Sequence, residues 1–456
     1  MDLTRSLADA TPVACRHADV AVIGGGASGV LMAVHLLRRS PQARVVLVEK
    51  TDLLGCGVAY ATNDPAHLLN TRVSNMSAFQ DAPEDFLAWL RQEVDPTACP
   101  YSFVSRSLYG RYLAETLDRL DGRDRLICLR GEAVRLVPRD GGVVLHLADG
   151  RSVAADTAIL ATGHALPDAD PEGALSLAWG GALPELDADV LIVGTGLTMV
   201  DKVLSLLDAG HRGRIEAFSR RGLLPQPHAD AAPQHIPPEA VPLGQPVSIL
   251  MRWLRRRVAE TEAQGGNWQS VVDGVRPHVQ RVWQAMDTDA RARFLRHGCG
   301  WWEVHRHRLP PSSATRLEAA RRAGRLTLRR AAFLDARRGP DRSALVRLRL
   351  PDGVEVSERF HHVLDCRGIR RDPERHASPV IRNLIAEGHA RVDPLRLGLT
   401  VDAHARVLQP DGTPLPGLFA LGPASRAAFW EITAIPDIRV QAAWLADALA
   451  GPGRPG

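Results

Sequence analysis

The chain has few lysines, few cysteines, few aromatic residues and no long apolar run. Its 456 residues include only Lys50 and Lys202, so 54 of the 56 basic residues are arginine. Aromatic residues make up 5%, while 45% of residues are hydrophobic and 24% are charged. These are ordinary globular values, which exclude a disordered, collagen-like or coiled-coil protein. At about 150 residues per domain, the length predicts two or three domains.

The shortage of cysteines and of apolar runs also bears on location. No two of the six cysteines have the C-x-x-C spacing that zinc or dithiol chemistry uses, so we expect a reducing, cytoplasmic environment. Residues 20–37 form the most apolar stretch, but glycines and His35 interrupt it, so no membrane span is expected. Asp2 and Asp9 lie in an N-terminus without an apolar core, which does not resemble a signal peptide.

The excess of arginine permits two interpretations. Arginine grips phosphate oxygens with its planar fork, but a GC-rich coding preference would give the same composition. The formal net charge is only +4, because 52 acids balance the basic residues. No basic run stands alone, so we expect no nucleic-acid partner.

A first glycine motif begins directly after an apolar stretch. Residues 19–37 read DVAVIGGGASGVLMAVHLL, in which Gly24, Gly26 and Gly29 form G-x-G-x-x-G between a predicted strand and a predicted helix. In a dinucleotide-binding fold the first glycine makes a tight turn, the second admits a pyrophosphate, and the third lets helix and strand pack closely. We also predict that Ser28 contacts the cofactor.

The acid that completes this fingerprint follows a second predicted strand. Residues 45–48 are apolar, and Glu49 stands 20 residues after Gly29. An acid at this position accepts hydrogen bonds from a ribose hydroxyl. The alternative, an ordinary turn followed by a surface glutamate, explains less of the pattern.

The same pattern occurs a second time. Residues 189–201 read DVLIVGTGLTMVD, with Gly194 and Gly196, but Met199 replaces the third glycine, so we expect looser packing of helix on strand. Thr198 is predicted to contact the cofactor. The next predicted strand, residues 215–218, ends at Ser219, which lies 25 residues after Gly194, just as Glu49 follows Gly24.

Arginines stand where the second fingerprint lacks its acid. Arg220 and Arg221 follow Ser219. An acid at this point repels a 2′-phosphate, whereas arginine holds one, so the second site is predicted to prefer NADPH over NADH. The alternative is two solvated arginines in an arginine-rich chain.

The repeat extends beyond the glycine motifs. Residues 142–147 and 344–350 alternate apolar and polar side chains before an Asp-Gly turn, which predicts hairpins of small antiparallel sheets. We therefore predict an α/β chain with two Rossmann-like dinucleotide-binding domains, each with a small antiparallel β element, plus a helical insert.

The repeat also suggests domain boundaries. Residues 1–185 would form the first part of one dinucleotide-binding domain, residues 186–344 the other domain, and residues 345–456 the second part of the first domain. The insert, residues 226–315, begins with a proline-rich loop and continues with three helical patterns, at residues 247–263, 267–286 and 287–297. We expect it to form the substrate site.

At this point the chain resembles flavoproteins with two dinucleotide-binding domains, and in particular a largely uncharacterised bacterial branch of FAD/NAD(P)-binding proteins. The resemblance rests on A-T-G at residues 161–163, on LLGCGVAYAT (53–62), on HLLN (67–70), on VHRHR (304–308), on GLFALG (417–422) and on FWEITAIPDIRVQ (429–441). It implies that residues 1–185 and 345–456 form the FAD-binding domain and that residues 186–344 form the NAD(P)H-binding domain, here for NADPH. It implies further FAD contacts at Thr162, Gly163, Gly422 and Gln441. In most relatives an aspartate follows the last glycine, whereas this chain has Pro423.

The C-terminal motif suggests how the flavin would be held. Pro436 precedes a helical pattern at residues 437–450 and suits the first turn of a helix. Free N–H groups at that helix start would stabilise negative charge on the N1/C2 edge of a reduced flavin. The alternative is that Trp430 and Ile432 are core residues and Glu431 caps the helix.

Two kinds of redox site are disfavoured. Cys56 lies where a disulfide reductase would carry one cysteine, but residue 61, five positions later, is Ala61, and a lone thiol cannot shuttle two electrons as a disulfide. His305 and His307 would share one face of a strand, but no third metal ligand is near, so we expect no metal site.

The A-T-G stretch with His164 after it is similar to the motif of N-hydroxylating flavin monooxygenases. That resemblance implies an NADPH-reduced flavin that forms a C4a-hydroperoxyflavin with molecular oxygen and hydroxylates a small amine or amino acid. One alternative is an NADPH-dependent reductase that passes electrons to a quinone or a partner protein. Another is a flavin-binding redox sensor without turnover, which Pro423 mildly favours.

Three residues are predicted to serve the chemistry. Asn70, in the HLLN loop, would donate a hydrogen bond near flavin N5/C4a. Arg306 and His307 would contact the substrate or NADPH. The identity of the substrate and the oligomeric state do not follow from the sequence.

Overall fold

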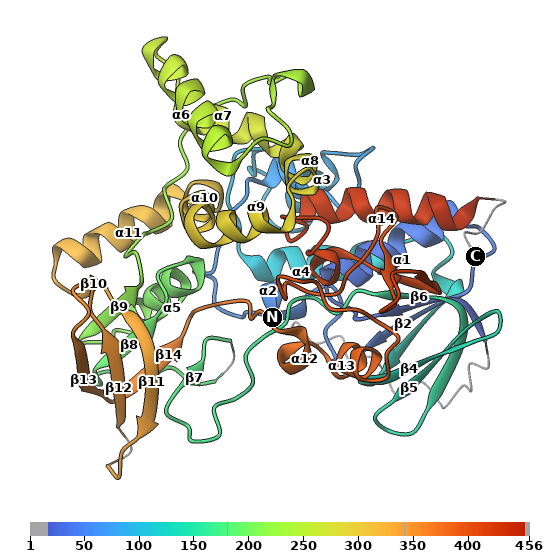
Figure 1. Ribbon diagram of the computed structural model, residues 1–456, viewed down its shortest axis with the longest axis horizontal. Helices are drawn as coiled ribbons and strands as arrows, with labels where there is room; N and C mark the ends of the chain where they lie inside the picture. Colours follow the sequence, from blue (N-terminus) through green and yellow to red (C-terminus); the bar gives the residue numbers. More distant parts are fainter. Residues whose placement is uncertain (1–16, 180, 342, 452–456) are drawn as a thin grey trace. The chain divides into compact units, whose positions relative to one another are not determined.

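The computed structural model describes residues 17–179, 181–341 and 343–451. Asp2, Asp9 and Cys15 lie outside these residues. The chain divides into two compact units, and Figure 1 labels most of their helices and strands. Unit 1 comprises residues 1–65, 71–166 and 370–456, and unit 2 comprises residues 66–70 and 167–369.

The sheet of unit 1 is mostly parallel, with strand order β15-β16-β6-β1-β2-β3. Its central strands are apolar runs buried on both faces, as parallel strands covered by helices must be. The strands of this unit are β1 Ala18–Ile23, β2 Val45–Glu49, β3 Leu126–Arg130, β4 Ala133–Arg139, β5 Gly142–Leu147, β6 Ser152–Leu160, β15 Arg406–Leu408 and β16 Pro414–Ala420.

Two helices far apart in the sequence, α1 and α14, pack side by side in unit 1 (Figure 1). The helix α14 begins at Ile435, with Pro436 in its first turn, which confirms the predicted helix. The helices of this unit are α1 Ala27–Arg39, α2 Gly57–Tyr60, α3 Asp85–Glu93, α4 Arg106–Asp118, α12 Pro373–His376, α13 Pro379–Ala386 and α14 Ile435–Ala450.

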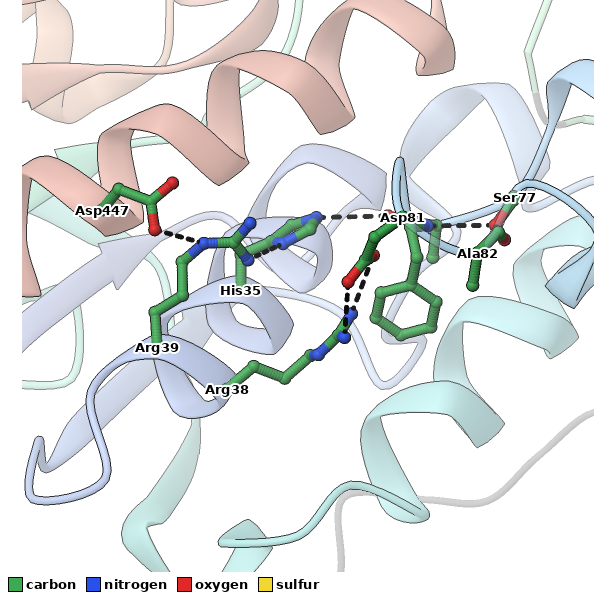
Figure 2. A network of polar contacts seen from close by, with 9 residues as sticks. His35, Arg38, Arg39, Ser77, Asp81, Ala82 and Asp447 are labelled. Carbon is green, nitrogen blue, oxygen red and sulfur yellow. Dashed lines mark hydrogen bonds and ion pairs between the residues drawn. The ribbon is translucent and has the colours of Figure 1, made fainter.

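A polar network fastens the C-terminal end of α1 (Figure 2). Arg39 donates to Asp447 on α14 at 2.5 Å and to Nδ1 of His35 at 2.8 Å. Arg38 pairs with Asp81 at 2.9 Å. The ring of His35 is 1% exposed and bonds through Nε2 to the carbonyl oxygen of Ala78 at 3.2 Å.

Unit 2 repeats the same plan. Its parallel sheet has the order β10-β9-β8-β14-β7, and β8, β9 and β10 correspond to β1, β2 and β3 of unit 1. The strands are β7 Ser176–Leu177, β8 Val190–Val193, β9 Ile215–Ser219, β10 Leu326–Arg330, β11 Ala332–Arg338, β12 Ala344–Arg349, β13 Glu355–Phe360 and β14 His362–Asp365.

Both units carry the predicted antiparallel element. In unit 1, β5 pairs with β4 and β6, and in unit 2, β12 pairs with β11 and β13. In unit 1 the strand β6 pairs both with the parallel strands β1 and β16 and with the antiparallel strand β5. In unit 2 two strands divide this role, because β13 lies in the antiparallel sheet and β14 in the parallel sheet. The predicted fold class, with two Rossmann-like units and small antiparallel elements, is therefore confirmed.

The helices of the predicted insert belong to unit 2. The helices of this unit are α5 Leu197–Asp208, α6 Val247–Ala263, α7 Trp268–Val275, α8 Val279–Gln284, α9 Thr288–Arg293, α10 Cys299–Arg306 and α11 Pro311–Arg322. The predicted helix at residues 247–263 is confirmed. The pattern at residues 267–286 forms two helices instead of one, because Pro277 lies in a 3₁₀ turn that separates α7 from α8.

The units do not divide at the boundaries that the sequence suggested. Residues 167–185 and 345–369 lie in unit 2, because β7 and β8 both pair with β14, and β12 and β13 complete the sheet of β11. Which unit holds which cofactor stays a prediction at this point. No helix among the described residues is long and apolar enough to cross a membrane.

Candidate dinucleotide-binding sites

The first glycine motif adopts a backbone that only glycine accommodates. Gly24 has φ +104°, and a Cβ there would lie 2.5 Å from the carbonyl oxygen of Ala161. A Cβ on Gly29 would lie 1.8 Å from the carbonyl oxygen of Gly24. These close approaches bring the start of α1 onto the carboxyl edge of β1 and β6, as the fingerprint requires.

The loop of this motif is held by the predicted acid. Glu49 accepts the N–H of Gly25 at 2.7 Å through one carboxylate oxygen. Its other oxygen accepts the N–H and the hydroxyl of Thr51, each at 2.9 Å. Glu49 thus lies at the carboxyl end of β2 beside the glycine loop, where a ribose hydroxyl would be read.

Both glycine-motif helices begin without any side chain that would satisfy their first N–H groups. The N-cap residues are Gly26 for α1 and Gly196 for α5, and neither helix has an acid in its first turn. The free N–H groups and the positive end of the helix dipole therefore suit a pyrophosphate. Thr198 stands in this first turn of α5.

Three predicted FAD contacts lie together in unit 1. The N–H of Gly422 donates to Gln441 on α14 at 2.8 Å, and a Cβ on Gly422 would lie 2.6 Å from the hydroxyl of Ser28 on α1. Gln441 also donates to Ser425, whose hydroxyl returns to the carbonyl oxygen of Gly422 at 2.9 Å. The loop after β16 is therefore fixed against the first turn of α1.

The A-T-G stretch ends β6 at the same edge. Thr162 and Gly163 follow the strand, and Gly163 has φ +73° with open space beside it. His164 comes next, and its pKa is lowered to about 3, first by burial and then by the charge of Arg426. Arg426 lies 4.5 Å over the ring of Trp430. His164 is therefore neutral at physiological pH.

Arg426 is a residue that the sequence analysis missed. Its Nε atom is buried and makes no hydrogen bond to any described residue. A guanidinium beside a neutral histidine and a tryptophan, four residues after Gly422, is suited to a polar group of a ligand. The one signal in the sequence is its position four residues after the GLFALG motif.

The second glycine motif has the same backbone as the first. Gly194 has φ +113°, and a Cβ there would lie 2.5 Å from the carbonyl oxygen of Cys366. Gly194 donates its N–H to Phe218 at 2.8 Å, as Gly24 does to Val48 at 2.8 Å. Gly196 differs from Gly26, because nothing lies within 4 Å of a Cβ built on it.

The turn after β9 contains the predicted NADPH residues. The Ser219 hydroxyl contacts that of Thr195 at 2.8 Å and accepts the N–H of Gly222 at 3.0 Å. Arg220 is exposed and forms no ion pair with any described residue. Arg221 donates to the carbonyl oxygen of Arg296 in the insert at 2.7 Å, so the two arginines are not equivalent.

Two of the predicted chemical residues lie on a helix, not on a strand. Residues 299–306 form α10, and the N–H of His307 donates to the carbonyl oxygen of Glu303 at 2.8 Å, which contradicts the strand expected for His305 and His307. The helical spacing turns the two histidines to different sides. The roles of Arg306 and His307 toward a substrate stay predictions.

Asn70 belongs to a short segment that packs in unit 2. The carbonyl oxygen of Asn70 contacts Nε2 of His228 at 3.0 Å, and Nε2 of His67 contacts the hydroxyl of Ser205 on α5 at 2.9 Å. Residues 66–70 are therefore fastened to the second unit by two histidines. A role of the Asn70 side chain near a flavin stays a prediction.

Arg308 is a second residue that the sequence analysis passed over. It is 4% exposed, donates to Gln269 at 2.5 Å and pairs with Asp273. Gln269 in turn donates to the carbonyl oxygen of Pro227 at 3.0 Å and accepts the N–H of Ala229. This buried network joins the two ends of the insert, so Arg308 is structural.

None of the described cysteines forms a disulfide with another described residue. Burial raises the pKa of Cys56 to about 11 and also raises that of Cys366, so neither thiol forms a thiolate readily near neutral pH. Within residues 17–179, 181–341 and 343–451, no group of three His, Cys, Asp or Glu side chains could hold a metal ion.

A family model described as FAD-NAD(P)-binding matches residues 21–165. The matched range contains the first glycine motif, Glu49 and the A-T-G stretch, so the prediction that this part of the chain binds a dinucleotide cofactor is confirmed.

One curated protein is a distant relative of this chain. YdhS of Escherichia coli K12, an uncharacterized protein, is 23% identical over 249 residues, which cover 45% of this chain and 46% of the relative. The match thus spans less than half the length of the curated relative.

Solved structures resemble this chain in fold over 95% of its length. An ornithine N-hydroxylase from Kutzneria sp. 744 has a TM-score of 0.62 and 14% identity and covers 95% of this chain and 99% of that chain. Thioredoxin reductase of Lactococcus lactis has a TM-score of 0.51 and 14% identity over the same shares. Both similarities are similarities of fold.

Proposed function

We propose that this protein is an FAD- and NADPH-dependent N-hydroxylating monooxygenase that acts on a small amine or amino acid with molecular oxygen. The observation that carries the proposal is the pair of glycine loops with the same backbone and opposite charge beside them. Glu49 follows the second strand of unit 1, and Ser219 and Arg220 follow the second strand of unit 2. The two loops would therefore take different dinucleotides.

The residues of unit 1 suit FAD. The pyrophosphate would lie at the start of α1 between Gly26 and Gly422, and Glu49 would accept the ribose hydroxyls. Neutral His164 and the guanidinium of Arg426 would lie at the carboxyl edge of β6 and β16, next to the start of α14. When bound, FAD supplies the two-electron redox chemistry that links NADPH to oxygen.

The residues of unit 2 suit NADPH. The open space beside Gly196 would admit the pyrophosphate, and the first turn of α5, with Thr198, would donate N–H groups to it. Arg220 would attract the 2′-phosphate.

The overall fold supports the monooxygenase more than the dithiol branch of reductases. The Kutzneria structure contains reduced FAD, NADP⁺ and L-ornithine, and its TM-score exceeds that of thioredoxin reductase. Cys56, the cysteine nearest in sequence to Glu49, has a raised pKa, and the described cysteines form no disulfide with one another. A reductase that passes electrons to a quinone or a partner protein is the alternative outcome of the test below.

The test is the stoichiometry of turnover by the FAD-loaded protein. L-ornithine, L-lysine and cadaverine are supplied in turn with NADPH, and consumed oxygen, hydrogen peroxide and hydroxylamine product are measured. One hydroxylamine per NADPH and per oxygen, with little peroxide, is expected for one of these amines. Rapid NADPH oxidation that yields only peroxide, or that a quinone accelerates, would instead establish the reductase. A flavin that NADPH does not reduce would establish the sensor.

A further inference from the structure

The internal repeat pairs two arginines at corresponding positions of the two sheets. At the carboxyl end of β2, Glu49 lies opposite Arg130 of β3, and at the carboxyl end of β9, Ser219 lies opposite Arg330 of β10. One residue later the backbones match as well, since Gly131 donates to the carbonyl oxygen of Glu49 at 2.9 Å and Ala331 donates to that of Ser219 at 3.1 Å.

The first of these arginines is neutralised. Arg130 pairs with Asp52 at 2.9 Å, and Asp52 stands three residues after Glu49. Two acids, Glu49 and Asp52, therefore surround this edge of unit 1. An additional negative group would be repelled there.

The second arginine has no such partner. Gly222 stands three residues after Ser219, in the place that Asp52 occupies in unit 1. A Cβ on Gly222 would lie 2.8 Å from Cγ of Arg330, so the stem of Arg330 crosses this turn. Arg330 is exposed and forms no ion pair with any described residue. Both acids of the first unit are thus replaced by small residues, and the arginine charge is left uncompensated.

Arg221 is less suited to a ligand than Arg330. Its guanidinium already donates to the carbonyl oxygen of Arg296 at 2.7 Å, and a Cβ on Gly300 would lie 2.9 Å from it. Redirecting Arg221 would break this bond to the insert. Of the three arginines around the turn, Arg220 and Arg330 are the two without a partner among the described residues.

We infer that Arg330, together with Arg220, binds the 2′-phosphate of NADPH and is a specificity-determining residue of unit 2. This inference rests on the proposed use of NADPH. Two guanidinium groups on adjacent strand ends can each donate two N–H groups to one phosphate, which favours NADPH over NADH. Arg221 then positions the insert.

The test measures binding of two small fragments to the FAD-loaded protein by calorimetry. 2′,5′-ADP carries the 2′-phosphate, and 5′-AMP lacks it. Arg330→Ala is expected to raise the dissociation constant of 2′,5′-ADP by about tenfold to a hundredfold, as expected for loss of a charge-assisted contact. The constant for 5′-AMP is expected to change by less than about twofold, and Arg330→Lys is expected to retain part of the preference.

The matched control is Arg337→Ala, which removes an exposed arginine on β11 that also forms no ion pair with a described residue. It should leave both constants unchanged. If Arg330→Ala weakens both fragments equally, or neither, while Arg220→Ala abolishes the preference, the inference about Arg330 is wrong and the use of NADPH stands. If the unmodified protein binds the two fragments equally well, the NADPH assignment itself is wrong.

Discussion

The two glycine loops share the features that the backbone needs and differ in the features that a ligand would read. Gly24 and Gly194 have nearly the same φ and the same 2.5 Å approach to a strand carbonyl. The residues around them have diverged, since Glu49 corresponds to Ser219. A duplicated fold thus keeps its turn while each copy changes its charge, which is how one chain can bind two dinucleotides.

Their helices show the same division. Gly29 has no room for a side chain, whereas Met199 at the corresponding position of α5 is fully buried. Further along, His35 of α1 corresponds to Ser205 of α5, and both are buried. These differences make the two units respond differently to mutation and to pH.

The largest effect is expected where the two loops are alike. Gly24→Ala and Gly194→Ala should each destabilise the fold by about 3 kcal/mol or more, because a Cβ would both clash with a strand carbonyl and require positive φ. The measurement is the free energy of unfolding by urea. The loss should be similar for the two variants if the loops are equivalent in the backbone.

Gly150→Ala is the control for this comparison. Gly150 also has positive φ, at +87°, but nothing lies within 4 Å of its Cβ position, so only the backbone strain of about 1 kcal/mol remains. If Gly150→Ala costs as much as Gly24→Ala, then the close approach to the strand carbonyl is not what selects glycine in the loops.

The next largest effect is expected from a decrease in pH, to which the two units should respond differently in stability. The pKa of His35 is lowered to about 4, first by burial and then by the charge of Arg39, and its Nδ1 accepts from that arginine while Nε2 faces the Ala78 carbonyl (Figure 2). Only the neutral ring satisfies both contacts. In the unfolded chain histidine titrates near its usual 6.5.

The sign follows from this lowered pKa. Stability from neutral His35 is fully present above pH 6.5 and falls as the pH decreases toward 4, by about 3 kcal/mol in all. The measurement is unfolding free energy between pH 7 and pH 4. His35→Gln keeps a donor and an acceptor and should flatten the profile, whereas Ser205→Ala in unit 2 should leave its slope unchanged. An unaltered slope in His35→Gln would assign the acid sensitivity to other groups.

Much of the fold could be predicted because its signals are local. The strands that end at Glu49 and Ser219 are short apolar runs, and the turns at Gly24 and Gly194 depend on residues adjacent in sequence. Proline also acts locally, although the expected helix at residues 267–286 overlooked Pro277. The repeat then predicted the topology, because the spacing from the first glycine to the end of the next strand is the same in both copies.

The remaining features depend on contacts that a sequence does not display. The sequence does not distinguish Arg220, Arg221 and Arg330 from one another. Only the fold shows that Arg221 donates to the insert and that Arg330 lies opposite Ser219. Residues 304–308 alternate like a strand, yet hydrogen bonds along the chain make residues 299–306 helical. Buried Arg308 could not be told from half-buried Arg306 by sequence pattern.

The smallest expected effect on stability, and the most specific effect on binding, concerns the second glycine of each loop. A Cβ on Gly26 would lie 3.3 Å from Cα of Gly57 in α2, whereas the space beside Gly196 is open. Gly196→Ala should therefore change the unfolding free energy by less than about 1 kcal/mol. Its methyl group would nevertheless occupy the space that a pyrophosphate needs, so the dissociation constant of NADPH should rise by about tenfold. FAD content, measured on the same preparation, should stay unchanged, because the first loop is untouched. A Gly196→Ala protein that binds NADPH normally would mean that the second loop does not hold the pyrophosphate, and the functional likeness of the two loops would end at their backbones.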